Sequence, residues 1–268
     1  MGTVFFYSLT AGMMAVLSTA DSRLVAWKFV RMVATMVFGI VCLVTYWRMQ
    51  ASDLGGSAVG GLSLGTGVGM GVAAMLLIFW APVCASTPRL FRVVCGLGGA
   101  SGLIAALAAS PGVIGAPVPG ALFWGLLGLS TLTGAMMLGS ITLAWLLGHA
   151  YLTATRMTIE PLRHFSRMLL FCVGARCAFL VISVVAGWWL GSVHGASFWA
   201  VLANSWLVLS LRVGVGIIAV AVFAYMVADC VRLRATQSAT GILYFASIFV
   251  YVGELASRQL LVDCGWPF

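Results

Sequence analysis

The last apolar stretch of the chain carries an acid and a base at a spacing that could support ligand binding or proton transfer. Glu254 and Arg258 are four residues apart, which places them on one face of a helix, and Tyr244 and Tyr251 fall on the same face. An ionisable group in hydrocarbon costs at least ~2.5–3.5 kcal/mol on insertion scales, so we expect this stripe to face the protein interior. It is either a structural ion pair or a site where Glu254 exchanges a proton beside a bound polar group.

Two further arginines interrupt long apolar runs. Arg176 and Arg212 fall about eleven and about fourteen residues into their predicted helices, which puts both near the middle of the membrane at 1.5 Å per residue. Glu254 is the one carboxylate expected at comparable depth. Because one acid cannot pair fully with three guanidiniums, either internal carbonyls and water or an anionic or carbonyl-bearing ligand must satisfy the rest.

Two histidines lie at the ends of apolar stretches beside a basic connection. His149 follows Trp145 by one helical turn, where an imidazole could pass protons between the cytoplasm and a buried site or simply lie in an interfacial aromatic belt. His164 begins the next stretch and could join His149 as an axial ligand of a b-type haem. One pair at helix ends is a weak signal, so we expect neither haem b nor a metal site.

Membrane-crossing helices must position these residues. Charged residues make up 7% of the chain and AVILMFWYC residues 62%, whereas a soluble domain has about 25% charged residues. About 20 apolar residues cross the ~30 Å hydrocarbon layer. The sequence therefore predicts an all-α polytopic membrane protein, a single helical-bundle domain over residues 1–268 with eight transmembrane helices near residues 3–20, 24–46, 62–82, 91–110, 121–148, 166–190, 198–227 and 239–262.

The basic residues are distributed unevenly between the two sides of this predicted bundle. By the positive-inside rule the odd-numbered connections face the cytoplasm, so both termini face outside, as in a multi-pass protein of the bacterial inner (plasma) membrane. The net charge of +8 then reflects topology and contact with lipids, and not nucleic-acid binding. The odd-numbered connections hold ten of the fourteen bases, namely Arg23, Lys28, Arg31, Arg89, Arg92, Arg156, Arg163, Arg167, Arg232 and Arg234.

The closing Gly253-Glu254 and Arg258, with eight spans and no haem motif, resemble the integral membrane subunits of the polysulfide reductase and DMSO reductase anchor family. The likeness covers this short motif and the topology. It implies a chain that exchanges electrons and protons with quinol on behalf of redox partner subunits, usually without a prosthetic group of its own. Only Glu254 and Arg258 can be matched to the family's quinol site.

These observations favour an integral membrane subunit of a respiratory or photosynthetic electron-transfer complex that binds a quinone or similar lipophilic ligand. Any enzymatic role would be that of a quinol-binding subunit of an oxidoreductase. Two alternatives stay open, a small-anion transporter that uses the unpaired arginines and a structural membrane anchor without a ligand. In the favoured hypothesis Glu254 and His149 handle protons, and the ligand contacts come from Arg258, Arg212, Arg176, Tyr251 and Tyr244.

Overall fold

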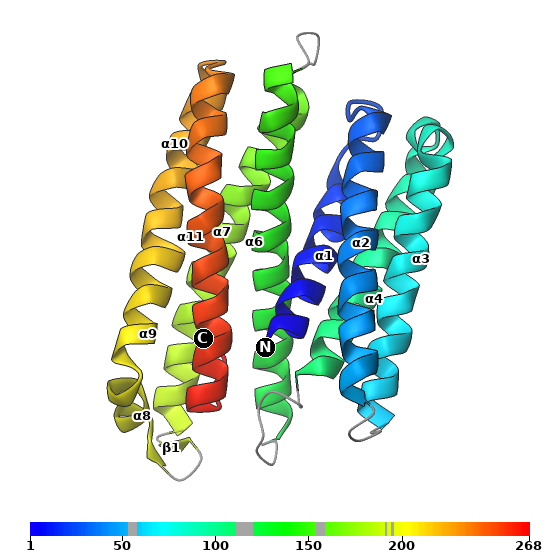
Figure 1. Cartoon of the computed structure of the whole chain (residues 1–268). Coiled ribbons are helices and arrows are strands. Elements are labelled where there is room, and N and C mark those ends of the chain that lie inside the picture. The colour runs from blue at the N-terminus through cyan, green and yellow to red at the C-terminus, as the bar shows by residue number, and fades with distance from the viewer. Residues whose placement is uncertain (53–57, 111–119, 154–158, 191, 194–195) are drawn as a thin grey trace.

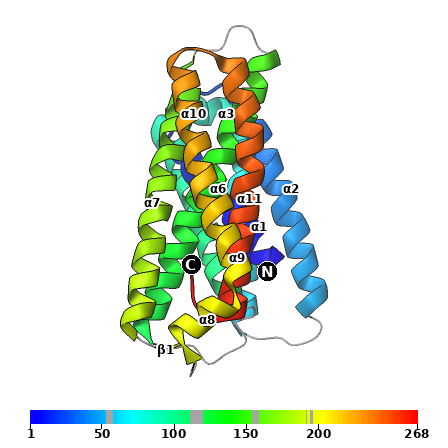
Figure 2. The same cartoon turned by 90° about the vertical axis from the view of Figure 1, so that its left-hand side faces the viewer.

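The computed structural model is a bundle of long helices that run alternately up and down (Figure 1, Figure 2). It describes residues 1–52, 58–110, 120–153, 159–190, 192–193 and 196–268. Two short strands, β1 (Ser192–Val193) and β2 (Ala196–Ser197), pair antiparallel. The helices are α1 (Gly2–Thr19), α2 (Trp27–Ser52), α3 (Ala58–Ser86), α4 (Pro88–Ala109), α6 (Ala121–Thr153), α7 (Glu160–Leu190), α8 (Phe198–Asn204), α9 (Trp206–Ser210), the π-helix η1 (Leu211–Ala219), α10 (Val220–Arg232) and α11 (Thr236–Cys264).

Eight segments of the described chain are helical, long and apolar enough to cross a membrane, so the predicted all-α, eight-span architecture is confirmed. The seventh span differs from the prediction. It runs over Trp206–Arg232 through α9, η1 and α10, and the preceding residues form the separate helix α8. Since Phe198–Asn204 is itself apolar, hydropathy extends the predicted span back across a break at Ser205 that composition cannot reveal.

Helix α1 lies in the middle of the bundle and joins its two halves (Figure 1). It packs against α4 and α2 on one side and against α6 on the other, while α6 also packs against α7 and α11. Gly12 of α1 and Gly139 of α6 allow the close crossing of these two helices, because a Cβ atom at either position would overlap the backbone of the other helix. Small residues of this kind let helices approach closely in lipid, where no hydrophobic force draws helices together.

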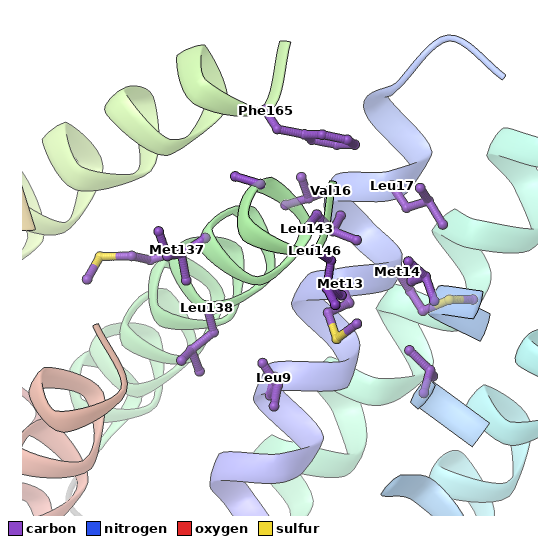
Figure 3. Packing of buried hydrophobic residues seen from close by; sticks show 14 of the residues in the cluster. Leu9, Met13, Met14, Val16, Leu17, Met137, Leu138, Leu143, Leu146 and Phe165 are labelled. Carbon is purple, nitrogen blue, oxygen red and sulfur yellow. The ribbon is translucent and has the colours of Figure 1, made fainter. Parts of the chain in front are cut away.

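Interlocking side chains fill the contact between α1 and α6 (Figure 3). Met13 and Leu9 of α1 lie beside α6, and Phe165 of α7 lies next to Val16. Met13, Val16 and Phe165 are almost fully buried. Dispersion contacts of this density hold the two halves together.

The facing ends of α1 and α2, of α3 and α4, of α6 and α7, and of α10 and α11 all lie at one end of the bundle, the upper end in Figure 1. We call this end the basic end, because nine of the ten bases predicted for the odd-numbered connections lie in the described residues at this end. The tenth, Arg156, lies outside the described residues. Both termini lie toward the opposite end (Figure 1). The assignment of the basic end to the cytoplasm stays a prediction from the positive-inside rule.

Candidate functional site

Glu254 of α11 is fully buried and holds two guanidiniums from neighbouring helices. Arg176 of α7 donates from Nε to Glu254 Oε1 and from Nη2 to Oε2, both at 2.9 Å, which is the two-pronged geometry that suits a carboxylate. Arg212 of η1 donates from Nη1 to Oε1 at 3.0 Å. Glu254, the one carboxylate expected at this depth, thus forms ion pairs with both deep arginines.

The guanidinium of Arg176 makes hydrogen bonds through all of its nitrogens. Nη1 donates to the backbone oxygen of Ser130 at 3.1 Å, to Ser130 Oγ at 3.2 Å and to Thr133 Oγ1 at 3.0 Å. Nη2 also donates to Ser257 Oγ at 3.1 Å, and the ring of Phe179 lies 5.1 Å from the guanidinium carbon. Arg176 is therefore fixed and fully satisfied within the protein.

Arg212 is equally buried but only partly satisfied. Its Nη1 donates to Glu254 and, at 3.2 Å, to the backbone oxygen of Gly253. Its Nε and Nη2 are buried and have no hydrogen-bond partner among the described residues. A buried charged donor without an acceptor costs more than about 1–3 kcal/mol, so these two nitrogens are the positions at which a ligand oxygen would gain most.

Local backbone geometry brings these side chains together. Arg212 is the second residue of the π-helix η1, a form of helix that occurs often at functional sites. Gly216 of η1 meets Gly253 of α11 so closely that a Cβ atom on either would overlap the other's Cα. Gly134 of α6 leaves room for the Glu254 carboxylate, which a Cβ there would overlap.

Arg258 lies one turn beyond Glu254 but does not form the expected ion pair within the helix. Its Nη2 donates to Ser8 Oγ of α1 at 2.9 Å, and the ion pairs of Glu254 are with Arg176 and Arg212. Both carboxylate oxygens already accept from those two arginines, which explains why Arg258 turns to α1. Arg258 is 4% exposed and still interacts electrostatically with Glu254.

We call Arg176, Arg212, Glu254 and Arg258 the arginine cluster. Its side chains comprise three guanidiniums and one carboxylate, so they carry a net charge of +2. Glu254 lies about 27 Å along α11 from the basic end and about 15 Å from the other end of that helix. Arg212 is six residues into its span and not fourteen, because the helix begins at Trp206. Glu254 and Arg212 therefore lie nearer the end of the bundle where the termini lie, whereas Arg176 lies near the middle of α7 (Glu160–Leu190).

The other predicted site residues lie along the contact between α6 and α11. The Tyr251 hydroxyl is 2.9 Å from Thr142 Oγ1 and accepts a hydrogen bond from Trp145 Nε1 at 3.3 Å. Tyr244 is 39% exposed, and its hydroxyl lies 2.8 Å from His149 Nδ1. The predicted polar stripe thus divides, with the tyrosines facing α6 and Glu254 facing α7 and η1.

The two histidines have different partners. His149 pairs with Tyr244 of α11, whereas His164 Nε2 lies 3.0 Å from Thr19 Oγ1 at the end of α1. Within the part of the chain that the structure describes, no group of three or more His, Cys, Asp or Glu side chains could hold a metal ion. The arginine cluster offers donors for an oxygen-bearing ligand and no set of metal ligands.

The structure adds residues to the site that sequence reasoning missed. Gly265 adopts a left-handed conformation after α11, and the following residues fold back into the bundle (Figure 2). Trp266 Nε1 donates to Ser183 Oγ at 3.0 Å, and the backbone oxygen of Phe268 accepts from Ser257 Oγ. Since Ser257 also contacts Arg176, this tail supports the cluster. A glycine followed by Trp-Pro-Phe after the last span was the available signal.

Comparisons with known proteins add no relative. No model of a known protein family matches the chain. No curated protein and no solved structure matches it either.

Proposed function

We propose that this multi-pass membrane protein is a subunit of an electron-transfer assembly of the bacterial inner membrane and binds a quinone or quinol at the arginine cluster. The observation that carries this proposal is that two buried nitrogens of Arg212, Nε and Nη2, have no hydrogen-bond partner in the described part of the chain. A quinone fits them because its ring is lipophilic and its carbonyl oxygens accept hydrogen bonds. Partner subunits would carry the other redox groups.

The charge of the cluster also fits this ligand class. Reduction of a bound quinone places negative charge on its oxygens, and three guanidiniums against one carboxylate favour that change. Arg176 and Glu254 hold each other in place, and Glu254 also orients Arg212. Arg212 supplies the free donors, and Arg258 adds positive charge. Proton exchange at Glu254 stays a prediction, because its two oxygens serve here as acceptors for Arg176 and Arg212.

The α6–α11 contact supplies groups for proton movement in this proposal. His149 and Tyr244 form a hydrogen-bonded pair of exposed residues at the basic end of α6. Tyr251 lies deeper, beside Trp145 and one turn before Glu254 on α11. These groups would carry protons between the basic end and the cluster, with His149 as the entry point.

A binding titration tests the proposal. The purified full chain in lipid nanodiscs is titrated with a short-chain ubiquinone and with a short-chain menaquinone, and quenching of tryptophan fluorescence reports binding. Arg212→Lys keeps the positive charge but loses the planar guanidinium and its several N–H donors, so we expect quinone to bind at least about tenfold more weakly. Arg232→Lys, at a mostly exposed arginine of the basic end, is the matched control.

Unchanged affinity in Arg212→Lys would refute this site. A second readout is quinol turnover in the native assembly. Full turnover per assembled complex after Glu254→Gln and Arg258→Leu would reject the predicted roles of both residues, and an altered assembly yield alone would favour the structural-anchor alternative.

A small-anion transporter is the second candidate, and the net charge of +2 on the cluster side chains is the observation that favours it. An anion would both accept from Arg212 and offset the excess charge. Uptake of labelled nitrate or chloride into vesicles that contain only this chain, with loss of uptake in Arg212→Ala, would support this candidate. Quinone binding without such uptake would exclude it.

A further inference from the structure

A second polar site lies at the basic end, away from the arginine cluster. A cavity of about 180 Å³ opens between the end of α1, the turn that follows it and the start of α7. Bases and acids from two separate parts of the chain line it together. The charged and titratable residues in its wall are Asp21, Glu160, Arg163, His164 and Arg167.

The three basic side chains share one face of α7. Arg163 and Arg167 are one turn apart, and His164 lies between them at three residues from Arg167. The first turn of α7 adds to the positive potential of Arg163 and Arg167, because the N-terminus of a long helix carries unpaired N–H groups and the positive end of its dipole. This wall of the cavity is therefore suited to a phosphate group.

The existing contacts leave donors available on this wall. Arg163 donates from Nη1 to Glu160 Oε1 at 2.7 Å, and its other nitrogens remain available to donate to a ligand. Arg167 is exposed and makes no hydrogen bond or ion pair with any residue that the structure describes. His164 contacts Thr19 through Nε2, so its Nδ1 remains available to a ligand.

The opposite wall carries negative charge and an apolar edge. Asp21 Oδ1 accepts from the backbone N–H of Arg23 at 3.0 Å, which leaves its second oxygen for a cation. Leu24 lines the cavity and is 47% exposed, and Trp27 nearby is 41% exposed. Exposed apolar side chains beside charged ones at the end of a membrane span are typical of the headgroup region.

We propose that this cavity binds the phosphate group of a phospholipid headgroup, with Arg163, His164 and Arg167 on the phosphate and Asp21 on the ammonium of an ethanolamine headgroup. Phosphatidylethanolamine places both charges within one small headgroup. This matches a cavity whose α7 wall carries Arg163, His164 and Arg167, with Glu160 paired to Arg163, and whose other wall carries Asp21. The same phosphate chemistry is offered by free inorganic phosphate. This site is independent of the function proposed for the arginine cluster.

Native mass spectrometry of the purified full chain tests the site. The protein is mixed separately with phosphatidylethanolamine, phosphatidylglycerol and phosphatidylcholine of identical acyl chains, with and without millimolar inorganic phosphate. We expect phosphatidylethanolamine to bind more tightly than phosphatidylcholine, whose methylated ammonium cannot donate to Asp21. Arg167→Gln should weaken the binding of phosphatidylethanolamine about fivefold, which is the effect of one basic residue at an anionic surface. Arg89→Gln, an exposed arginine of the same end outside the cavity, should leave binding unchanged.

A second variant separates the two charges of the headgroup. Asp21→Asn should remove the preference for phosphatidylethanolamine over phosphatidylcholine and leave phosphatidylglycerol binding intact. Equal binding of all three lipids, with no effect of Arg167→Gln, would overturn the proposal. If inorganic phosphate displaces phosphatidylethanolamine, the proposal that the bound phosphate group belongs to a lipid would be overturned.

Discussion

Replacing Glu254 with glutamine should strongly destabilise the protein. The carboxylate accepts three charged N–H groups, from Arg176 Nε and Nη2 at 2.9 Å and from Arg212 Nη1 at 3.0 Å. Glutamine keeps one acceptor oxygen and turns an amide N–H₂ toward a guanidinium. Because removing one partner leaves buried charge uncompensated, we expect a loss of about 3–5 kcal/mol in the free energy of unfolding.

The matched control is the same change at Glu160. Its ion pair with Arg163 is 2.7 Å long, but the side chains are 52% and 32% exposed, so Glu160→Gln should cost about 0–1 kcal/mol. Steric trapping in bicelles measures both variants against the native chain. Equal losses for Glu254→Gln and Glu160→Gln would refute the reasoning that Glu254 is the counter-ion of two buried arginines.

Three further substitutions test the packing around the site by the same measurement. Gly139→Ala should cost about 1–3 kcal/mol in the free energy of unfolding, because its Cβ overlaps α1. Gly128→Ala on the same helix meets no atom of the described residues within 4 Å and should be neutral or stabilising, so equal effects of the two variants would contradict the close crossing. Tyr251→Phe removes a hydroxyl with two partners and should cost about 0.6–1.7 kcal/mol; no measurable change would argue against those hydrogen bonds. Trp266→Phe loses the donor to Ser183 and should cost about 0.5–1.5 kcal/mol, and a variant as stable as the native chain would show that the tail does not dock.

The number of spans and their alternation could be predicted from the sequence, because apolar length and the position of arginines report directly on the membrane. The start of the seventh span could not. Hydropathy measures composition, and Phe198–Asn204 is mostly apolar like the helix that follows, although the backbone turns at Ser205. The π-helical turn that carries Arg212 likewise has no signature in the periodicity of apolar residues.

The shared ion pairs of Glu254 could be predicted because charge is scarce in this chain. With one acid at that depth, the deep arginines had few other partners. The position of Arg258 could not be predicted, since spacing along one helix does not tell which neighbouring helix competes for a side chain. Ser8 of α1 lies 250 residues away in the sequence and takes that hydrogen bond. The role of Ser257 could not be predicted either, because it depends on how the C-terminal residues fold back against α11.

The content of quinone in protein purified from its native membrane tests the central claim most directly. Extraction and mass analysis of the native chain and of Arg212→Lys, prepared identically, compares bound quinone per protein. We predict about one quinone per native chain and a large loss in Arg212→Lys, since the proposed contact is with the Arg212 nitrogens that no described residue satisfies. Phospholipid alone in the native preparation, or equal quinone in both preparations, would contradict the account.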